Sequence, residues 1–331
     1  MTKCVVIGSN AFSGQDFVDY LLSETDWQVI GTSRSAEKPD FFLRYKQNKA
    51  RSRFAFHRLD LNGDSTALLD LLDREKPEYI VNFAAQSEVA PSWEHPDHWF
   101  ETNTVALAKL VNHLRRKGDY LKRYLHISSP EAYGSCVGRV VETTPDNPST
   151  PYAASKAAAD MITSVYQKQY GFPLVTVRAT NVYGAHQQLF KIIPRSVIYI
   201  KLGKTIELHG GGVAVKSYIH IRDVSKGELR ILTKGRVGER YHISPDGGVA
   251  VKDVVRIIAE RMGKRFADVT RIVEERPGQD AAYVIDSTKA RTELGWKPDI
   301  SVEQGLKDVV DWVEANWAEI QKQDLNYTHK A

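Results

Sequence analysis

A glycine-containing turn between an apolar run and a helical stripe stands at the start of the chain. The run Cys4–Ile7 reads as a buried strand, and Phe17, Leu21 and Leu22 recur at helical spacing. The turn between them is Gly8-Ser9-Asn10-Ala11-Phe12-Ser13-Gly14. A strand, a glycine turn and a helix in this order aim backbone N–H groups at a phosphate. The segment therefore favours an α/β fold that binds a dinucleotide, and an ordinary tight turn is the alternative.

Apolar runs alternate with helical periodicity over the first 184 residues, which predicts a Rossmann-type, doubly wound parallel sheet. The expected strands are 4–7, 28–32, 54–59, 79–83, 124–128 and 174–179, with long helices at 99–117 and 152–170. Beyond residue 184 the regularity breaks. We expect helices at 192–202 and 251–262, strands returning to the sheet edge at 217–221 and 240–244, a capping box at Ser301, and a frayed tail after Gln321.

This pattern predicts two domains. Residues 1–184, with the returning strands at about 217–244, are expected to bind the dinucleotide. Residues 185–216 and 245–331 are expected to form a smaller C-terminal α/β domain that binds the substrate. The segment 39–53 is basic and aromatic without a clear period, and we assign it no role.

Charge and cysteine content narrow the class of protein. The 331 residues carry a formal charge of +4 without a basic run, which gives nucleic-acid binding little support. Cys4 and Cys136 lack metal-ligand spacing, so we expect two reduced thiols and no metal site. No signal peptide and no apolar run of membrane-spanning length is evident. These features predict a cytoplasmic protein that contacts no membrane.

The ends of three expected strands carry residues suited to a dinucleotide. After the second strand come Ser33 and Arg34, with no carboxylate before Glu37. A ribose 2′-phosphate would meet a guanidinium there, which favours NADP over NAD. Asp60 and Leu61 follow the third strand, where a carboxylate suits an adenine amino group. The small residues Ala84 and Ala85 follow the fourth strand and let a cofactor pass close to the backbone.

A tyrosine and a lysine one helical turn apart follow the fifth strand. Tyr152 and Lys156 are four residues apart and share one helix face. An ammonium near a phenol stabilises the phenolate, so we expect a lowered tyrosine pKa and general-base function. The strand end before them reads Ser128-Ser129-Pro130-Glu131-Ala132-Tyr133-Gly134.

With these motifs in one order, followed by Arg178-Ala179-Thr180-Asn181-Val182-Tyr183-Gly184, the chain resembles the extended short-chain dehydrogenase/reductase family. More narrowly, it resembles the nucleotide-sugar 4,6-dehydratases typified by GDP-mannose and dTDP-glucose 4,6-dehydratase. The likeness runs from Val5 to about Trp312. In the dTDP-glucose branch an aspartate stands where this chain has Pro130, and the family threonine is Ser129. Pro130 and the segment after the fourth strand lean toward the GDP-mannose branch.

The resemblance implies a reaction and its residues. Tyr152 would deprotonate the sugar C4 hydroxyl while C4 gives a hydride to the nicotinamide, and Ser129 would bond the same oxygen. Glu131 would take the C5 proton, water would leave from C6, and the hydride would return to C6. The cofactor, NADP or NAD, would stay bound and be regenerated each turnover. Its expected contacts are Gly8, Asn10, Ala11, Phe12, Ser13, Gly14, Ser33, Arg34, Asp60, Leu61, Ala84, Ala85, Asn103, Tyr152 and Lys156.

The resemblance also implies a nucleotide-diphosphate sugar as substrate, with a GDP-sugar favoured. The expected contacts are Ser87, Glu88, Asn181, Lys191, Arg195, Lys216 and Arg276. In this family helices such as 99–117 and 152–170 pair across a two-fold axis, which implies a homodimer, with a tetramer as a further possibility.

Three other functions are compatible with the same fold. A 4-epimerase returns the hydride to C4 and needs no base for C5, so Glu131 disfavours it. A UDP-glucuronate decarboxylase keeps the glutamate but needs a basic residue for the sugar carboxylate. A catalytically silent dinucleotide-binding regulator would be expected to lose Tyr152, Lys156 or Glu131, and all three are present.

Overall fold

The computed structural model describes residues 1–136, 138–274 and 282–330. Its centre is a seven-stranded parallel sheet in the order β11-β6-β5-β4-β1-β2-β3. In that order the strands are Arg240–Ile243, Leu174–Ala179, Arg123–Ile127, Tyr79–Asn82, Lys3–Ile7, Gln28–Ser33 and Phe54–Arg58. The chain proceeds outward in opposite directions from β1 and β4, and the crevice at such a switch point is where α/β sheets bind ligands.

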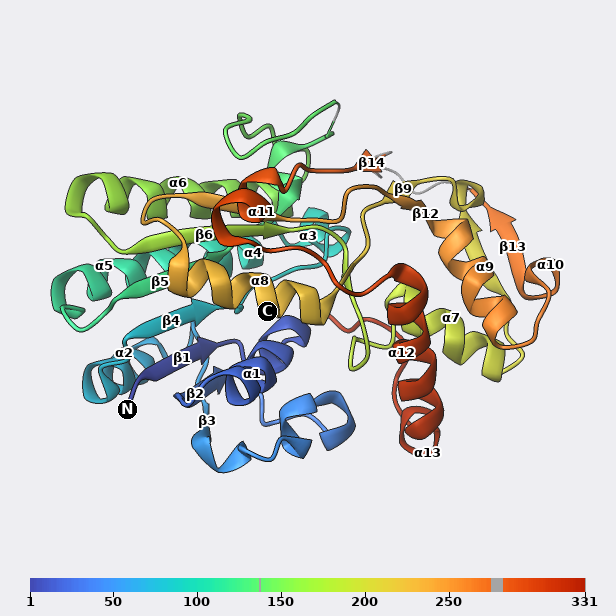
Figure 1. Cartoon of the computed structure of the whole chain (residues 1–331), viewed down its shortest axis with the longest axis horizontal. Helices are drawn as coiled ribbons and strands as arrows, with labels where there is room; N and C mark the ends of the chain where they lie inside the picture. The colour runs from blue at the N-terminus through green and yellow to red at the C-terminus, as the bar shows by residue number, and fades with distance from the viewer. Residues whose placement is uncertain (137, 275–281, 331) are drawn as a thin grey trace.

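Helices cover both faces of the sheet, which confirms the doubly wound fold (Figure 1). Successive residues of β1 show why: Cys4 and Val6 pack on one side, and Val5 and Ile7 pack on the other. A strand buried on both faces is apolar throughout rather than alternating. One face carries α2 (Ser65–Glu75), α5 (Leu107–Lys117) and α6 (Pro151–Tyr170), and the other carries α1 (Phe12–Glu24), α8 (Ile221–Lys234) and α11 (Thr288–Leu294).

A second hydrophobic core lies beside the sheet. It joins α7 (Ile192–Lys201), α9 (Val251–Arg261) and α12 (Val302–Ala315). The capping box at Ser301 that starts α12 is present as expected. Short elements complete this part: β8 (Ile206–His209) with β13 (Thr270–Val273), β9 (Val215–Lys216) with β12 (Val249–Ala250) and β14 (Ala282–Tyr283), α10 (Phe266–Val269), and α13 (Trp317–Ile320).

Two expected elements differ in the structure. The expected returning strand 217–221 is only β10 (Ile219–His220), which pairs with β7 (Val182–Tyr183) and stays outside the large sheet. Residues 240–244 do return, as β11 beside β6. The expected helix 99–117 is divided into α4 (Pro96–Phe100), a π-helical segment η4 (Glu101–Ala106) and α5, with α3 (Pro91–Glu94) before it. The segment 39–53 folds as three 3₁₀ turns, η1 (Asp40–Phe42), η2 (Arg44–Gln47) and η3 (Arg51–Arg53).

The C-terminal tail is packed against the protein rather than frayed. The carbonyl of Lys330 accepts hydrogen bonds from Arg34 (3.3 Å) and from Gln86 (2.7 Å). The ring of His329 stacks at 5.2 Å on Trp99. The tail thus joins the ends of β2 and β4, at the edge of the sheet where a dinucleotide is expected. No helix among the described residues has the length and apolar character to cross a membrane.

Candidate active site

The glycine turn between β1 and α1 leaves no room for side chains. Gly8 has a φ of +84°, and a Cβ there would lie 2.5 Å from the backbone nitrogen of Ala84. A Cβ on Gly14 would lie 2.3 Å from the Gly8 carbonyl oxygen. The turn therefore requires glycine at both positions, and Gly8 lies against the backbone that follows β4. This cradle fits the diphosphate of a dinucleotide.

The other expected cofactor contacts gather along the same carboxyl edge. Ser33 ends β2 and accepts a 3.0 Å hydrogen bond from the backbone N–H of Asn10, whose side chain bonds the carbonyl of Ala36 at 2.8 Å. Arg34 is exposed beside it. Further along, Asp60 accepts a hydrogen bond from the Asn62 backbone. Two of the set are core residues, Phe12 and Leu61, which are buried among other apolar side chains.

The Asn103 side chain makes three hydrogen bonds within the protein. Its amide donates to the Gln86 carbonyl (3.0 Å) and to the Ser155 hydroxyl (2.9 Å), and its oxygen accepts from the Gln86 N–H (2.9 Å). The side chain therefore ties the loop after β4 to α6. Asn103 lies within the π-helical segment η4.

Strand β5 and helix α6 bring the expected catalytic residues together. Thr150 caps α6 by accepting a 3.1 Å hydrogen bond from the Ala153 N–H, and Pro151 follows at the first helical position. Tyr152 is thus held in the first turn, opposite the end of β5. There Ser129 and Glu131 share with Tyr152 a cavity of about 190 Å³. The Ser129 hydroxyl accepts a 3.3 Å hydrogen bond from the Glu131 N–H, which fixes the turn.

The ionisation of Tyr152 and Lys156 differs from the expectation. Burial and the Glu131 carboxylate raise the pKa of Tyr152, although a hydrogen bond with Ser129 opposes them. Burial also lowers the pKa of Lys156 to about 8, and its ammonium donates a 2.6 Å hydrogen bond to the Ile127 carbonyl. The expectation that Lys156 lowers the tyrosine pKa is therefore wrong, because desolvation dominates and favours the neutral phenol.

A buried ion-pair network under this site was not anticipated from the sequence. Asp160, two helical turns after Tyr152, accepts hydrogen bonds from Ser128 (2.7 Å) and from Arg178 (2.5 Å). His126 lies 3.0 Å from the other Asp160 oxygen. The positive partners lower the pKa of Asp160 despite its burial. The four-residue spacing of Tyr152, Lys156 and Asp160 was a readable signal for this residue, since it puts all three on one helix face.

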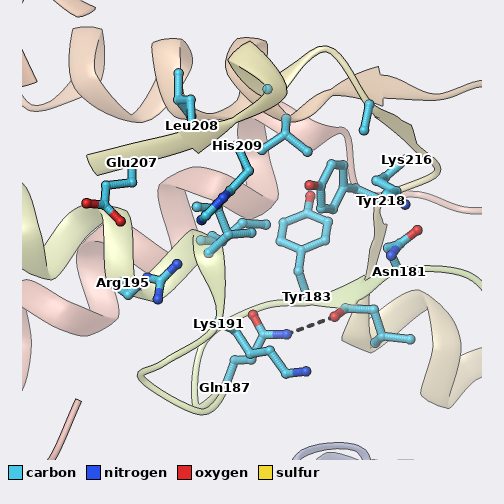
Figure 2. Close-up of a pocket in the computed structure, with 16 residues that line it drawn as sticks. Asn181, Tyr183, Gln187, Lys191, Arg195, Glu207, Leu208, His209, Lys216 and Tyr218 are labelled. Carbon is cyan, nitrogen blue, oxygen red and sulfur yellow. Dashed lines mark hydrogen bonds between the residues drawn. The ribbon is translucent and has the colours of Figure 1, made fainter. Parts of the chain in front are cut away.

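A larger cavity of about 360 Å³ adjoins the first, and Asn181 and Val182 line both. Figure 2 shows Asn181 and Lys216 at one end of it and Arg195 and Glu207 at the other. His209 and Tyr218 line it as well. Sequence reasoning had named the cations and Asn181 but not Glu207 or His209, which lie on β8 without a motif around them.

The remaining expected substrate contacts lie nearby or outside the described residues. Lys191 lines the larger cavity and forms a 2.7 Å ion pair with Glu88, from the loop after β4. Ser87 is exposed in that loop. Arg276 lies outside the described residues. Among the residues that the structure does describe, no cluster of His, Cys, Asp or Glu is suited to hold a metal ion.

A glycine cradle at the switch point of a parallel sheet, next to a Tyr–Lys helix, defines a dinucleotide-dependent enzyme of the short-chain dehydrogenase/reductase class. The sequence matches the family model of GDP-mannose 4,6 dehydratase over residues 5–309. The chain belongs to this family. It is a nucleotide-sugar 4,6-dehydratase, a hydro-lyase that depends on a nicotinamide dinucleotide.

Curated relatives and solved structures agree with this placement. The chain is 33% identical over 279 residues to a dTDP-glucose 4,6-dehydratase of Xanthomonas campestris, a match that covers 78% of this chain and 79% of the relative. The structure of dTDP-glucose 4,6-dehydratase from Bacillus anthracis in complex with NAD is similar with a TM-score of 0.86 and 30% identity, over 96% of this chain and 98% of that one. The structure of DesIV, a dTDP-glucose 4,6-dehydratase from Streptomyces venezuelae with NAD and TYD bound, has a TM-score of 0.86 and 31% identity, over 97% and 100% of the two chains.

Proposed function

We propose that Tyr152, Ser129 and Glu131 carry out the dehydration of a nucleotide-linked hexose in the 190 Å³ cavity that they share. The observation that supports this is their convergence at one wall of a cavity that opens, through Asn181 and Val182, onto a second cavity lined by cations. The first is suited to a sugar beside a nicotinamide, and the second to a nucleotide diphosphate. Lys156, one turn after Tyr152 on the same face of α6, orients the phenol in this proposal.

In the proposed reaction the bound dinucleotide takes a hydride from C4 of the sugar and later returns it to C6. Tyr152 accepts the C4 hydroxyl proton, while Ser129 hydrogen-bonds the same oxygen. The resulting 4-ketone acidifies the C5 hydrogen, and Glu131 removes that proton. Pro130 has no ionisable group, so Glu131 then gives its proton to the departing C6 hydroxyl, which leaves as water. C5 finally takes up a proton from solvent.

A preference for NADP is a second proposal, and it concerns the end of β2. Arg34 follows Ser33 there, and the nearest carboxylate, Glu37, is held by Tyr45 and Lys46 at 2.8 Å each. Glu37 therefore does not compete for a ribose hydroxyl. A guanidinium is well suited to a 2′-phosphate because it can donate two parallel hydrogen bonds. The two solved relatives described above were determined with NAD.

We further propose a GDP-sugar as substrate. If the sugar lies beside Tyr152 and the diphosphate beside Asn181 and Lys216, the base reaches the end of the larger cavity at Glu207. A carboxylate can accept hydrogen bonds from both N1–H and the 2-amino group of guanine, whereas thymine and uracil present a single N–H there. Glu207 is paired with Arg271, which keeps it ionised by lowering its pKa.

Two more proposals concern the roles of the two domains and the oligomeric state. Residues 1–184 with the returning segment at about 217–244 would hold the dinucleotide, and residues 185–216 and 245–331 would hold the nucleotide sugar. Apolar side chains exposed near η4 and on α6 support a homodimer through these helices: Phe100, Val105, Met161 and Val165. Asn103 would position the cofactor loop rather than contact the cofactor.

The deciding experiment supplies the purified protein with GDP-mannose, dTDP-glucose, UDP-glucose and UDP-glucuronate in turn, with NAD or NADP. We expect one of them to lose the mass of a water and to give a product with 4-keto absorbance in alkali. A C4 epimer of unchanged mass, or loss of carbon dioxide, would instead establish an epimerase or a decarboxylase. With Glu131→Gln, hydride removal should persist while exchange of the C5 proton with solvent stops; continued exchange would mean that another base acts.

A further inference from the structure

A buried glutamate that the proposed reaction does not use also lines the smaller cavity. Glu228 lies on α8 and is 1% exposed, yet it borders the cavity that holds Tyr152 and Glu131. Its Oε2 atom has no hydrogen-bond partner among the described residues. A buried polar atom without a partner is costly, and the great majority in folded proteins find one. Its position on the cavity wall indicates that a ligand supplies the missing partner.

Among the residues that the structure describes, no cation forms an ion pair with Glu228. From α1, the carboxylate of Asp16 faces it, and that carboxylate is itself matched by Arg44 and Arg222 at 3.2 Å each and by the Ser225 hydroxyl at 2.8 Å. Across the cavity the titratable groups are Glu131 and Tyr152. Burial and the Asp16 carboxylate raise the pKa of Glu228 well above its ordinary value. Both effects favour the protonated, neutral form of this carboxyl.

The cavity also indicates which part of a ligand Glu228 meets. Its wall runs from Ser13, in the glycine turn, to Tyr152, the residue that faces the reacting carbon in the proposed function. A dinucleotide that spans these two points has its nicotinamide half between them. The oxidised nicotinamide ring carries a formal positive charge, and the reduced ring is neutral. A positive charge close to a buried carboxyl favours its ionised form, and a neutral ring does not.

We propose that Glu228 is a charge-responsive cofactor-binding residue, which ionises when the oxidised dinucleotide binds and so favours the oxidised over the reduced form. The proton leaves to solvent on binding, and the carboxylate then pairs with the ring charge. This inference rests on the proposed function only in that the nicotinamide occupies the cavity with Tyr152. It gives the enzyme a means of starting each turnover with the cofactor in the form that can accept a hydride.

The test is calorimetric binding of oxidised and reduced NAD and NADP, in two buffers of different ionisation enthalpy. Wild-type protein should release a proton when it binds the oxidised form and none when it binds the reduced form. Glu228→Gln keeps the shape but cannot ionise, so it should bind the oxidised form about tenfold more weakly and the reduced form equally well, because about one pKa unit of interaction is lost.

Glu142→Gln is the matched control. Glu142 is a mostly buried carboxyl whose pKa is also raised by burial, but it does not line this cavity, and its replacement should change neither affinity. Equal weakening of both cofactor forms in Glu228→Gln, or the absence of proton release by the wild type, would overturn the proposal. The wild-type measurement decides the matter even if the variant folds poorly. Because no nucleotide sugar is present, the outcome is separate from that of the dehydratase assay.

Discussion

The ammonium of Lys156 is bonded to the backbone carbonyl of Ile127, the last residue of β5, at 2.6 Å. The contact joins the helix that carries Tyr152 to the strand whose end carries Ser129. It uses one of the three ammonium donors and leaves two for a ligand. The hydrogen bond thus fixes the position of the Lys156 ammonium, although the charge is buried.

Replacement of Lys156 by Met should stabilise the fold at neutral pH. Its folded pKa of about 8 lies below the ordinary value of 10.5, so the unfolded chain binds the proton more tightly. The buried Lys156 charge therefore lowers the free energy of unfolding by its full amount below pH 8. This effect disappears as the pH rises toward 10.5. We expect Lys156→Met to add about 2 kcal/mol to the free energy of unfolding at pH 7, after the lost hydrogen bond is subtracted, and little at pH 10.5. Urea titrations at both pH values measure this, with the exposed Lys168→Met on the same helix as the unaffected control. A gain at pH 7 that persists undiminished at pH 10.5 would contradict the assignment.

Tyr152→Phe should slow the reaction strongly without loss of binding. The phenol hydroxyl is the group proposed to take the C4 proton, and general-base catalysis contributes about 10² to 10⁴ in rate. We expect the single-turnover rate of 4-keto formation to fall at least about a hundredfold. Dissociation constants for dinucleotide and nucleotide sugar should change little. Tyr166→Phe, on the same helix but outside the cavity, should behave as the wild type, and a Tyr152→Phe enzyme that keeps its full rate would refute the assigned role.

Asp160→Asn should destabilise the fold strongly. It removes the 2.5 Å carboxylate partner of the fully buried Arg178 guanidinium, which then keeps the Asp146 carboxylate, at 2.8 Å. Breaking one side of a buried ion pair costs about 3 to 5 kcal/mol when the remaining charge has no partner, so we expect a loss near the lower end of that range. Chemical denaturation near pH 7 would measure the loss. Asp73→Asn, which removes the more exposed contacts with His113 (2.7 Å) and Lys117 (3.4 Å), should cost only about 1 kcal/mol; similar losses for the two variants would argue against a special role for the buried network.

Arg34→Ala should separate the two cofactors. If Arg34 binds the 2′-phosphate, its loss weakens NADP binding about tenfold or more while NAD binding changes little. Titration with each dinucleotide provides the comparison, and Arg74→Ala on α2 is a control distant from the β2 end. An equal effect on NAD and NADP would remove the basis for the proposed preference.

Removal of the tail from residue 324 onward should speed cofactor association. Lys330 occupies donors of Arg34 and Gln86 at the sheet edge, and its loss opens that edge. Stopped-flow mixing with dinucleotide is expected to show a severalfold faster association. Trp99 fluorescence should change as well, since the His329 ring leaves its face. An unaltered association rate in a truncated protein whose Trp99 fluorescence has changed would show that the tail does not obstruct binding.

The sheet was predictable because its strands are apolar on both faces and are followed by residues typical of turns. Cys4–Ile7 and Leu174–Ala179 were recognisable in this way to within a residue. The strand expected at 217–221 was not, because two residues paired with β7 carry no periodicity of their own. The π-helical segment at Asn103 could not be predicted either, because its apolar stripe is compatible with a regular α-helix.

In the candidate site, too, local motifs were predictable and properties that depend on packing were not. Tyr152, Lys156 and Glu131 follow from motif spacing, but their charge states do not, because desolvation depends on what the whole fold places around them. Glu228 had no motif at all. It stands in an ordinary amphipathic helix, and only the packing of α8 against α1 and the sheet brings it to the cavity wall.

The ion pair between Lys191 and Glu88 links the loop before α7 to the loop after β4. In the proposed binding mode, a diphosphate that binds Lys191 displaces the Glu88 carboxylate. A single inorganic phosphate gains little binding energy from that displacement, whereas a ligand that also contacts the neighbouring cations gains more. We therefore expect the pair to disfavour the binding of small anions relative to that of a nucleotide sugar.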